Sequence, residues 1–281
     1  MILSFNIEYR TNWGEEVKLA GLSTESTPMY TTDGIYWTAE VELEVPQEGL
    51  TIHYSYQIEQ NGIVIRKEWN NFPRCLFLSG TPRKKYRIND CWKNIPEQLY
   101  LYSSAFTEAL LSHPERVDIP QGYKKGLIIK AYAPRINKDY CLAICGNQKA
   151  LGNWDPEKAV LMSDSNFPEW QVELDASKLK YPLEYKFILC HKQERKIDCW
   201  EKNPNRYLAD PEIKTNETLV ISDRYVYFDI PMWKGAGIAI PVFSLKSEKS
   251  FGVGDFGDLK LMIDWAVNTH QKVIQILPIN D

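Results

Sequence analysis

The feature that most restricts the fold of this chain is an internal repeat. In the first copy Tyr54 precedes Trp69 by 15 residues, and in the second copy Tyr185 precedes Trp200 by the same 15. The His-Tyr-Ser-Tyr segment of the first copy corresponds to Glu-Tyr-Lys-Phe in the second, and the same comparison pairs Trp37 with Trp170 and Trp69 with Trp200. Because each repeated block carries its own apolar positions and turns, the repeat predicts two successive domains of one fold.

Both copies show the period of two that is typical of half-buried strands. Leu3, Phe5 and Ile7 occupy alternate positions, and residues 37–45 have one apolar and one acidic face. Turn formers such as Asn61-Gly62 separate these runs. The pattern predicts a mainly β chain with two tandem antiparallel β-sandwich domains of immunoglobulin-like type. The expected ranges are 1–92 for the first sandwich, 93–125 for a linker with a short helix, and 126–230 for the second sandwich.

The last part of the chain, residues 231–281, has a different pattern. Residues 237–242 form an apolar run without alternation, as expected for a strand that is covered on both faces. Asp258 precedes an amphipathic helix, and residues 273–277 form a second apolar run. This order predicts a βαβ unit with two parallel strands. Two strands cannot form a stable core alone, so we expect a third domain that continues beyond this sequence.

Composition and charge exclude several classes of protein. The net charge of -4 and the isoelectric point of about 5.7 argue against a nucleic-acid partner. The N-terminus reads as a strand rather than a signal peptide, and no apolar run approaches the length of a membrane span. The six cysteines contain no CxxC pair, which favours reduced thiols over a zinc site. We therefore expect a cytoplasmic protein without a membrane partner, of undetermined oligomeric state.

Candidate ligand-binding residues gather between Gly146 and Arg206. Trp154 lies in a Gly-Asn-Trp-Asp-Pro turn, and turns run over the surface. Trp200 lies beside a polar segment, and Lys186 points away from the face of its apolar neighbours. An indole ring offers a flat apolar face to the C–H groups of a sugar, and an ammonium group donates hydrogen bonds to hydroxyls. Trp154, Lys186 and Trp200 therefore form a candidate sugar-binding platform.

Three further residues of this stretch have two interpretations. Glu201 offers an acceptor and Asn205 both a donor and an acceptor, although either residue is equally compatible with a simple turn. Trp170 shares a strand face with Val172 and Leu174, so core packing explains it as well as ligand contact does.

The second copy resembles the family 20 starch-binding module. The resemblance rests on Leu-Gly-Asn-Trp-Asp-Pro at 151–156, Tyr-Lys at 185–186 and the segment from Trp200 to Arg206. It implies a β-sandwich that binds α-1,4-glucan at up to two sites. The first site would contain Trp154, Lys186, Trp200, Glu201 and Asn205, and the second would include Trp170.

The first copy departs from that pattern. It lacks the turn that carries Trp154, and it has Ser55 in place of Lys186. By the same resemblance it retains Trp13 and Trp37 for the second kind of site. We therefore expect the two copies to divide the two sites between them.

The last 45 residues resemble the start of the (β/α)8 barrel of glycoside hydrolase family 77, the 4-α-glucanotransferases. The match rests on Ser250-Phe-Gly-Val-Gly-Asp-Phe-Gly-Asp-Leu259 and on Leu277-Pro-Ile-Asn-Asp281. It implies transfer of glucan segments by a retaining mechanism that uses two carboxylates and no cofactor. Those carboxylates would lie beyond Asp281, so residues 1–281 are expected to bind glucan without transferring it. Asp255 and Asp281 fall where barrels build substrate grooves, although helix capping explains Asp255 or Asp258 equally well.

The alternative hypothesis is a non-catalytic regulatory protein that binds glycogen or starch. The apolar runs of residues 237–279 argue against it, because they predict further barrel strands.

Overall fold

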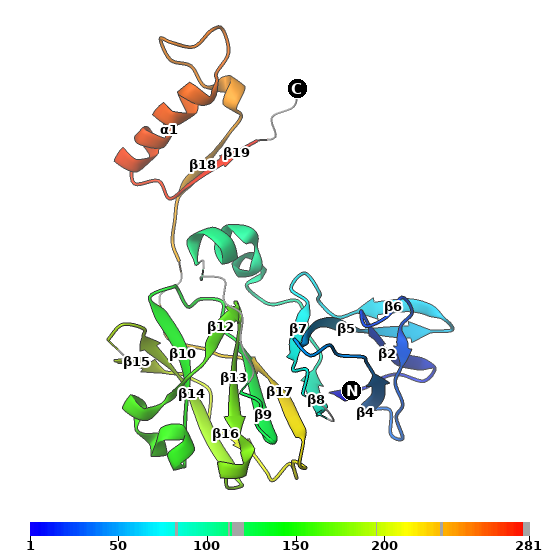
Figure 1. Ribbon diagram of the computed structural model, residues 1–281. Helices are drawn as coiled ribbons and strands as arrows, with labels where there is room; N and C mark the ends of the chain where they lie inside the picture. Colours follow the sequence, from blue (N-terminus) through cyan, green and yellow to red (C-terminus); the bar gives the residue numbers. More distant parts are fainter. Residues whose placement is uncertain (82–83, 112, 114–120, 195, 231–232, 278–281) are drawn as a thin grey trace. The chain divides into compact units, whose positions relative to one another are not determined.

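The computed structural model describes residues 1–81, 84–111, 113, 121–194, 196–230 and 233–277 (Figure 1). The chain divides into two compact units, Met1–Asp229 and Ile230–Asp281. Among the described residues, no helix combines the length and the apolar character needed to cross a membrane.

The first unit contains two β-sandwich modules in series. The strands of the first module are β1 (Ile2–Glu8), β2 (Glu15–Ala20), β3 (Thr27–Pro28), β4 (Tyr36–Glu42), β5 (Leu50–Gln60), β6 (Ile63–Lys67), β7 (Arg74–Leu78) and β8 (Lys85–Cys91). Those of the second module are β9 (Lys125–Tyr132), β10 (Tyr140–Gly146), β11 (Val160–Leu161), β12 (Ser163–Asn166), β13 (Glu169–Asp175), β14 (Leu183–His191), β15 (Ile197–Trp200), β16 (Arg206–Leu208) and β17 (Glu217–Tyr225). Short helical turns of the second module are η3 (Lys149–Trp154), η4 (Pro156–Lys158) and η5 (Ala176–Lys178). The predicted mainly β fold is confirmed.

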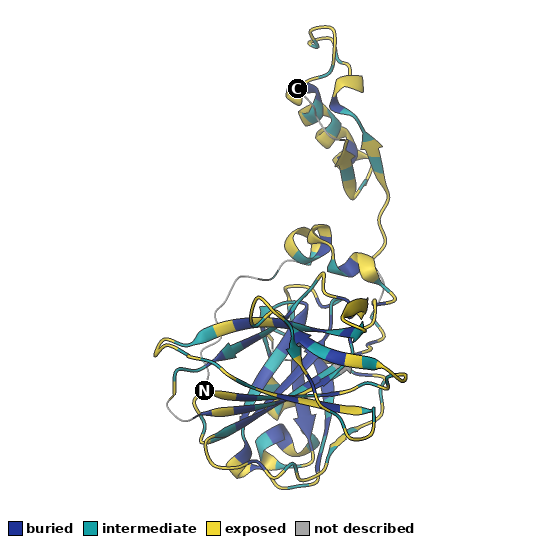
Figure 2. Ribbon diagram, turned by 90° about the vertical axis from the view of Figure 1, so that its right-hand side faces the viewer, coloured by how far each residue is buried: buried dark blue, intermediate teal, exposed yellow. Residues whose placement is uncertain are grey.

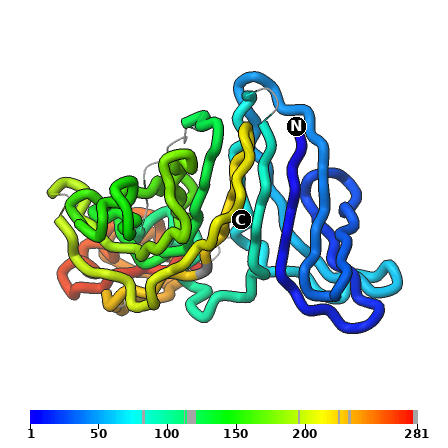
Figure 3. Tube along the Cα trace, turned by 90° about the horizontal axis from the view of Figure 1, so that it is seen from below, coloured from blue at the N-terminus to red at the C-terminus, as the bar shows by residue number. Residues whose placement is uncertain are grey.

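One sheet runs through both modules. Its seven strands lie in the order β12-β13-β9-β17-β8-β1-β4, and β17 pairs in parallel with both β8 and β9. In Figure 3 the yellow β17 lies beside the cyan β8, between the two modules. Each module adds its own second sheet, β3-β2-β5-β6 with β7 in the first and β11-β10-β14-β15 with β16 in the second. The two sandwiches therefore share a hydrogen-bonded wall.

The predicted alternation along the strands is confirmed by burial. Leu3, Phe5 and Ile7 on β1 are buried, whereas their neighbours are half-buried or exposed. Figure 2 shows the buried residues gathered along the strands of the larger unit. Val220 of β17 belongs to the same apolar cluster as these three residues. Burial of this much apolar surface is the main favourable term of folding, so the shared sheet couples the stability of the two modules.

The segment between the modules holds η1 (Leu99–Tyr102) and a π-helix, η2 (Ala105–Leu110). The helix predicted near residues 103–112 is thus present, although shorter. Phe106 is its buried residue, and its ring packs edge-on against Tyr100. Residues 112 and 114–120 of the expected linker lie outside the described residues.

The second unit contains β18 (Gly237–Ile240), η6 (Val242–Ser244), α1 (Phe256–Asn268) and β19 (Val273–Ile276). β18 and β19 pair in parallel, as predicted. Asp255 caps α1 by accepting from the backbone N–H groups of Gly257 and Asp258, and the Asp258 carboxylate accepts from the Asp255 N–H. Capping therefore accounts for both aspartates, and Asp281 lies outside the described residues.

Candidate glucan-binding site

Two tryptophans form an aromatic platform on the second module. The ring centroids of Trp154 and Trp200 lie 6.2 Å apart, and the ring planes are inclined by 47°. Both side chains are half-buried, so one part of each ring packs on the protein while the other part faces solvent. The structure thus brings together two residues that lie 46 positions apart in the chain.

Local turn chemistry presents Trp154. Leu151 anchors η3 in the core, and the backbone then takes positive φ at Gly152, Asn153 and Trp154. A Cβ atom at Gly152 would lie 2.9 Å from the Lys158 carbonyl oxygen, so this position requires glycine for space as well as for conformation. The two following residues, Asn153 and Trp154, also take left-handed backbone, and the Trp154 side chain remains half-buried.

Lys186 lies on β14 between the buried Tyr185 and Phe187, and its side chain is half-buried on the opposite face. Ile188 occupies the same face two residues further along, and it is the cross-strand partner of Trp200. Lys186 is therefore placed on the strand face that carries the platform, as the sequence predicted.

Glu201 has a different position from the one predicted. Its carboxylate is buried, accepts a hydrogen bond of 2.8 Å from the Phe187 backbone N–H, and pairs with Arg206 at 2.9 Å. Arg206 also pairs with Asp223 at 3.4 Å. Since the carboxylate is occupied inside the protein, Glu201 holds the end of β15 that carries Trp200 and does not face a sugar.

Burial and ion pairing shift the pKa values of Asp223 and Arg206 in this cluster. Burial raises the pKa of Asp223, and the opposing effect of Arg206 does not cancel it. Burial alone would lower the pKa of Arg206, but hydrogen bonding to Glu201 and the charge of Asp223 raise it overall. The guanidinium therefore stays charged and fixes both carboxylates.

Asn205 lies on the surface beside this cluster. Its side-chain amide N–H donates to Glu184 Oε1 at 2.9 Å, and its side chain is exposed. The exposed amide is accessible to a ligand, in contrast to Glu201.

Trp170 belongs to the core. Its exposed fraction is 0%, and its indole N–H donates to the Ala133 carbonyl oxygen at 3.3 Å. His113 and Phe167 pack edge-on against its ring, and these two rings stack on each other at 4.1 Å. The predicted ligand contact for Trp170 is therefore wrong, because a second aromatic layer covers it.

Trp13 and Trp37 of the first module do not form a comparable platform. Trp13 is 100% exposed in the turn before β2, whereas Trp37 is only 5% exposed. The Trp37 indole N–H donates to the Tyr9 carbonyl oxygen at 3.1 Å, just as Trp170 donates to Ala133. The predicted pairing of Trp37 with Trp170 in the repeat is confirmed by this geometry, and both residues are structural.

The repeat contains a buried cluster that the sequence reasoning missed. In the first module Arg74 pairs with Glu68 at 3.0 Å and with Asp90 at 2.9 Å. Asp90 accepts hydrogen bonds from the hydroxyls of Tyr54 and Tyr56. In the second module the corresponding pairs are Arg206–Glu201 and Arg206–Asp223, and the Tyr185 hydroxyl donates to Asp223 at 2.7 Å.

Backbone contacts fix the alignment of the two copies. The Glu68 N–H donates to Tyr56 as the Glu201 N–H donates to Phe187, so Glu68 corresponds to Glu201. Lys67 then corresponds to Trp200, and the pairing of Trp69 with Trp200 is wrong. The hairpin between Phe187 and Glu201 is two residues longer than the one between Tyr56 and Glu68. The equal spacing from tyrosine to tryptophan in the two copies hides this difference. The charged Arg74 at the start of the otherwise apolar strand Arg74–Leu78 was the available signal.

Both units contain residues that match known protein families. Residues 129–220 match the starch-binding domain family, and residues 240–281 match the 4-alpha-glucanotransferase family. The chain is 27% identical over 305 residues to the 4-alpha-glucanotransferase DPE2 of Oryza sativa subsp. japonica, covering 99% of this chain and 31% of the rice protein. The chain thus spans about a third of that relative's length.

Two further proteins are similar to shorter parts of the chain. The 4-alpha-glucanotransferase of Chlamydia trachomatis serovar D is 49% identical over 45 residues, 16% of this chain and 8% of that protein. The family 20 CBM of the maltotetraose-forming amylase from Pseudomonas saccharophila STB07 is 18% identical, covers 35% of this chain and 99% of its own, and has a TM-score of 0.29. Together with the folded sandwich around Trp154 and Trp200, the family matches identify a starch-binding domain at residues 129–220 and part of a 4-alpha-glucanotransferase domain at residues 240–281.

Proposed function

We propose that this chain is the α-glucan-binding region of a 4-α-glucanotransferase and that its principal binding site is the Trp154–Trp200 platform. The observation that carries the proposal is the inclined pair of half-buried rings at 6.2 Å. Two inclined apolar faces fit successive rings of a curved α-1,4-glucan better than they fit a flat ligand.

Polar groups beside the platform complement the sugar hydroxyls. The Lys186 ammonium supplies up to three hydrogen-bond donors, and the exposed Asn205 amide supplies a donor and an acceptor. Glu201 acts indirectly, because its bonds to Phe187 and Arg206 fix the backbone next to Trp200. The site is preorganised, which lowers the entropic cost of binding.

The second unit supports the proposal for the whole enzyme. Its helix α1 exposes Leu261 and Trp265 on one side and Ile263 and Val267 on another, apolar side chains that further layers of structure would cover. The complete protein would transfer glucan segments by a retaining mechanism in the cytoplasm, with a covalent intermediate on one carboxylate and a second carboxyl as acid and base. The binding modules would raise the local concentration of glucan near the barrel.

Affinity electrophoresis in amylopectin gels tests the binding site. Trp154→Ala and Trp200→Ala should each weaken retention by about tenfold or more, as expected for aromatic residues that dominate an interface. Lys67→Ala, at the position in the first module that corresponds to Trp200, is the matched control and should migrate like the unmodified chain. Equal retention of all these variants would refute the platform.

Transfer activity tests the enzyme proposal. Residues 1–281 should release no glucose from maltotriose, whereas the same chain extended through a complete barrel should do so. Absence of transfer in the extended protein would contradict the proposal.

A further inference from the structure

The parallel strands of the shared sheet end in aromatic residues. Tyr9 and Trp92 follow β1 and β8, and their ring centroids lie 4.4 Å apart. Tyr132 and Tyr225 end β9 and β17, and their ring centroids lie 5.9 Å apart. Because these four strands are parallel neighbours, both aromatic pairs lie at the same edge of the sheet.

A cleft of about 1400 Å³ opens at this edge between the two modules. This volume exceeds the roughly 300–1,000 Å³ of ordinary small-molecule sites, so the cleft has room for an extended ligand. Tyr36 and Tyr227 line it with exposed fractions of 63% and 55%. Amide side chains that line it are Asn6, Asn89, Asn94 and Asn203.

The charges around the cleft favour a neutral ligand. Arg74 is bound to Glu68 and Asp90, and Arg206 is bound to Glu201 and Asp223. Burial lowers the pKa of Lys93 to about 8, and its ammonium lies over the rings of Trp69, Phe72 and Tyr132. These three cations are already neutralised or enclosed, and the exposed Glu8 and Arg10 that also line the cleft carry opposite charges. The lining therefore offers little excess positive charge to an anionic ligand.

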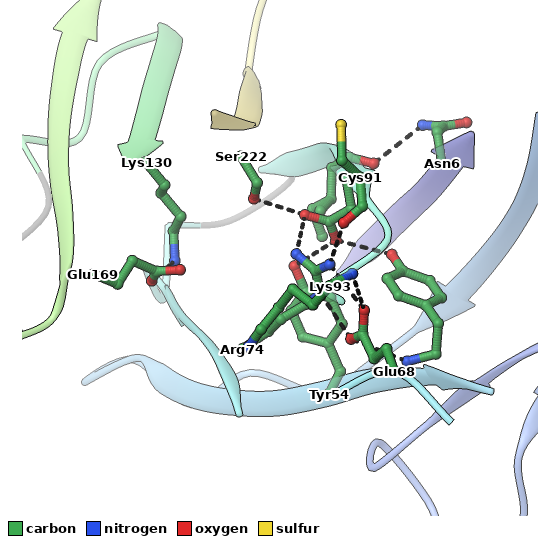
Figure 4. Close-up of polar contacts among 12 residues, drawn as sticks. Asn6, Tyr54, Glu68, Arg74, Cys91, Lys93, Lys130, Glu169 and Ser222 are labelled. Carbon is green, nitrogen blue, oxygen red and sulfur yellow. Dashed lines mark hydrogen bonds and ion pairs between the residues drawn. The ribbon is translucent and has the colours of Figure 1, made fainter. Parts of the chain in front are cut away.

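Buried polar contacts join the two modules, and one of them lies in the lining of the cleft (Figure 4). The Ser222 hydroxyl of β17 donates to Asp90 of β8 at 2.7 Å. Lys130 of the second module pairs with Glu169 at 2.9 Å and also donates to the Cys75 carbonyl oxygen of the first module. These contacts therefore fix the first module against the second at the cleft.

From these observations we infer that the cleft is a second α-glucan-binding site, built jointly by the two modules and separate from the Trp154–Trp200 platform. Aromatic faces, side-chain amides and balanced charge are the features that a neutral polyhydroxylated chain requires. The choice of glucan as ligand rests on the proposed function. The site itself rests on the cleft geometry.

Isothermal titration calorimetry with maltoheptaose tests the inference in the chain of residues 1–281. A platform variant, Trp154→Ala/Trp200→Ala, should retain one binding event. Adding Tyr36→Ala and Tyr227→Ala should weaken that remaining event by about tenfold or more. Tyr30→Ala, which removes a tyrosine that is 70% exposed and does not line the cleft, is the matched control.

The outcomes separate the two claims. Loss of all binding in the platform variant would overturn the cleft site and leave the proposed function intact. No binding by the unmodified chain would overturn both. Asn89→Ala offers an independent route, because this exposed amide lines the cleft and its loss should weaken the same event. An Asn89→Ala effect no larger than that of Tyr30→Ala would also count against the cleft.

Discussion

The first and second modules share a buried charge cluster but differ at the surface above it. Glu68, Arg74 and Asp90 repeat the contacts of Glu201, Arg206 and Asp223. The surface positions have diverged, because Ser55 and Lys67 stand where the second module has Lys186 and Trp200. A scaffold and the site that it carries can therefore change independently.

The comparison also shows what the buried cluster contributes. A buried ion pair is weak evidence for stability, because desolvation offsets the attraction between its charges. The contacts from Glu68 and Glu201 to a strand backbone instead fix where each hairpin joins the sandwich. In the second module that junction lies next to Trp200, so a structural contact becomes a positioning contact.

The largest predicted effect compares the two central arginines. Arg74→Met should lower the free energy of unfolding by about 3–5 kcal/mol, because it leaves two fully buried carboxylates without a cation. Arg206→Met should lower it by about 1–3 kcal/mol, because Asp223 retains some contact with solvent. Urea denaturation of both variants measures the difference. Equal losses would show that burial does not distinguish the clusters.

The second prediction concerns Asp164, whose carboxylate contacts one residue of the linker and one residue of the second module. Burial opposes the charged form, but hydrogen bonds from His113 and Lys192 outweigh it and hold the pKa of Asp164 well below its usual range. Such a carboxylate stabilises the fold above the unfolded-state pKa of about 3.9, and this contribution is lost as the pH falls towards the folded-state pKa.

Asp164→Asn should therefore lower stability by about 1–3 kcal/mol at pH 7. The difference from the unmodified chain should shrink below about pH 4. Thermal unfolding between pH 7 and pH 3 measures this trend. A difference that is independent of pH would show that the carboxylate charge is not involved.

The third prediction exchanges the residue types at two corresponding positions, Lys186 of the second module and Ser55 of the first. Lys186→Ser should weaken maltoheptaose binding by about 3- to 10-fold, which corresponds to the loss of one or two hydrogen bonds. Ser55→Lys should leave binding unchanged, because the first module lacks the aromatic partners of that position. Calorimetric titration measures both affinities. A gain of affinity in Ser55→Lys would show that the first module retains a site of this kind.

The smallest predicted effect is that of Trp13→Ala. Its side chain is fully exposed, so stability should change by no more than about 0.5 kcal/mol. If the modules divide the binding sites, the substitution should reduce the residual amylopectin retention of a Trp154→Ala variant. Unchanged retention in that background would contradict the hypothesis that the two modules divide the binding sites between them.

Part of the site was predictable because its signals are local. The Gly-Asn-Trp-Asp-Pro turn exposes Trp154 through backbone conformations that glycine and asparagine favour. The alternation around Lys186 assigns its face from three adjacent residues. Glu201 was not predictable in this way, because its partner Arg206 binds it only after β15 and β16 have paired with β14.

By itself, the sequence determined the strand periodicity, the repeat of two modules, the turn that carries Trp154 and the capped helix of the second unit. These features depend on residues close together in the chain. The tertiary structure alone decided that Trp37 and Trp170 are covered, that one sheet joins the modules and that a cleft lies between them. The physical reason is that alternation along a strand assigns each side chain to one of the two faces of the sheet. Only long-range packing decides what covers that face.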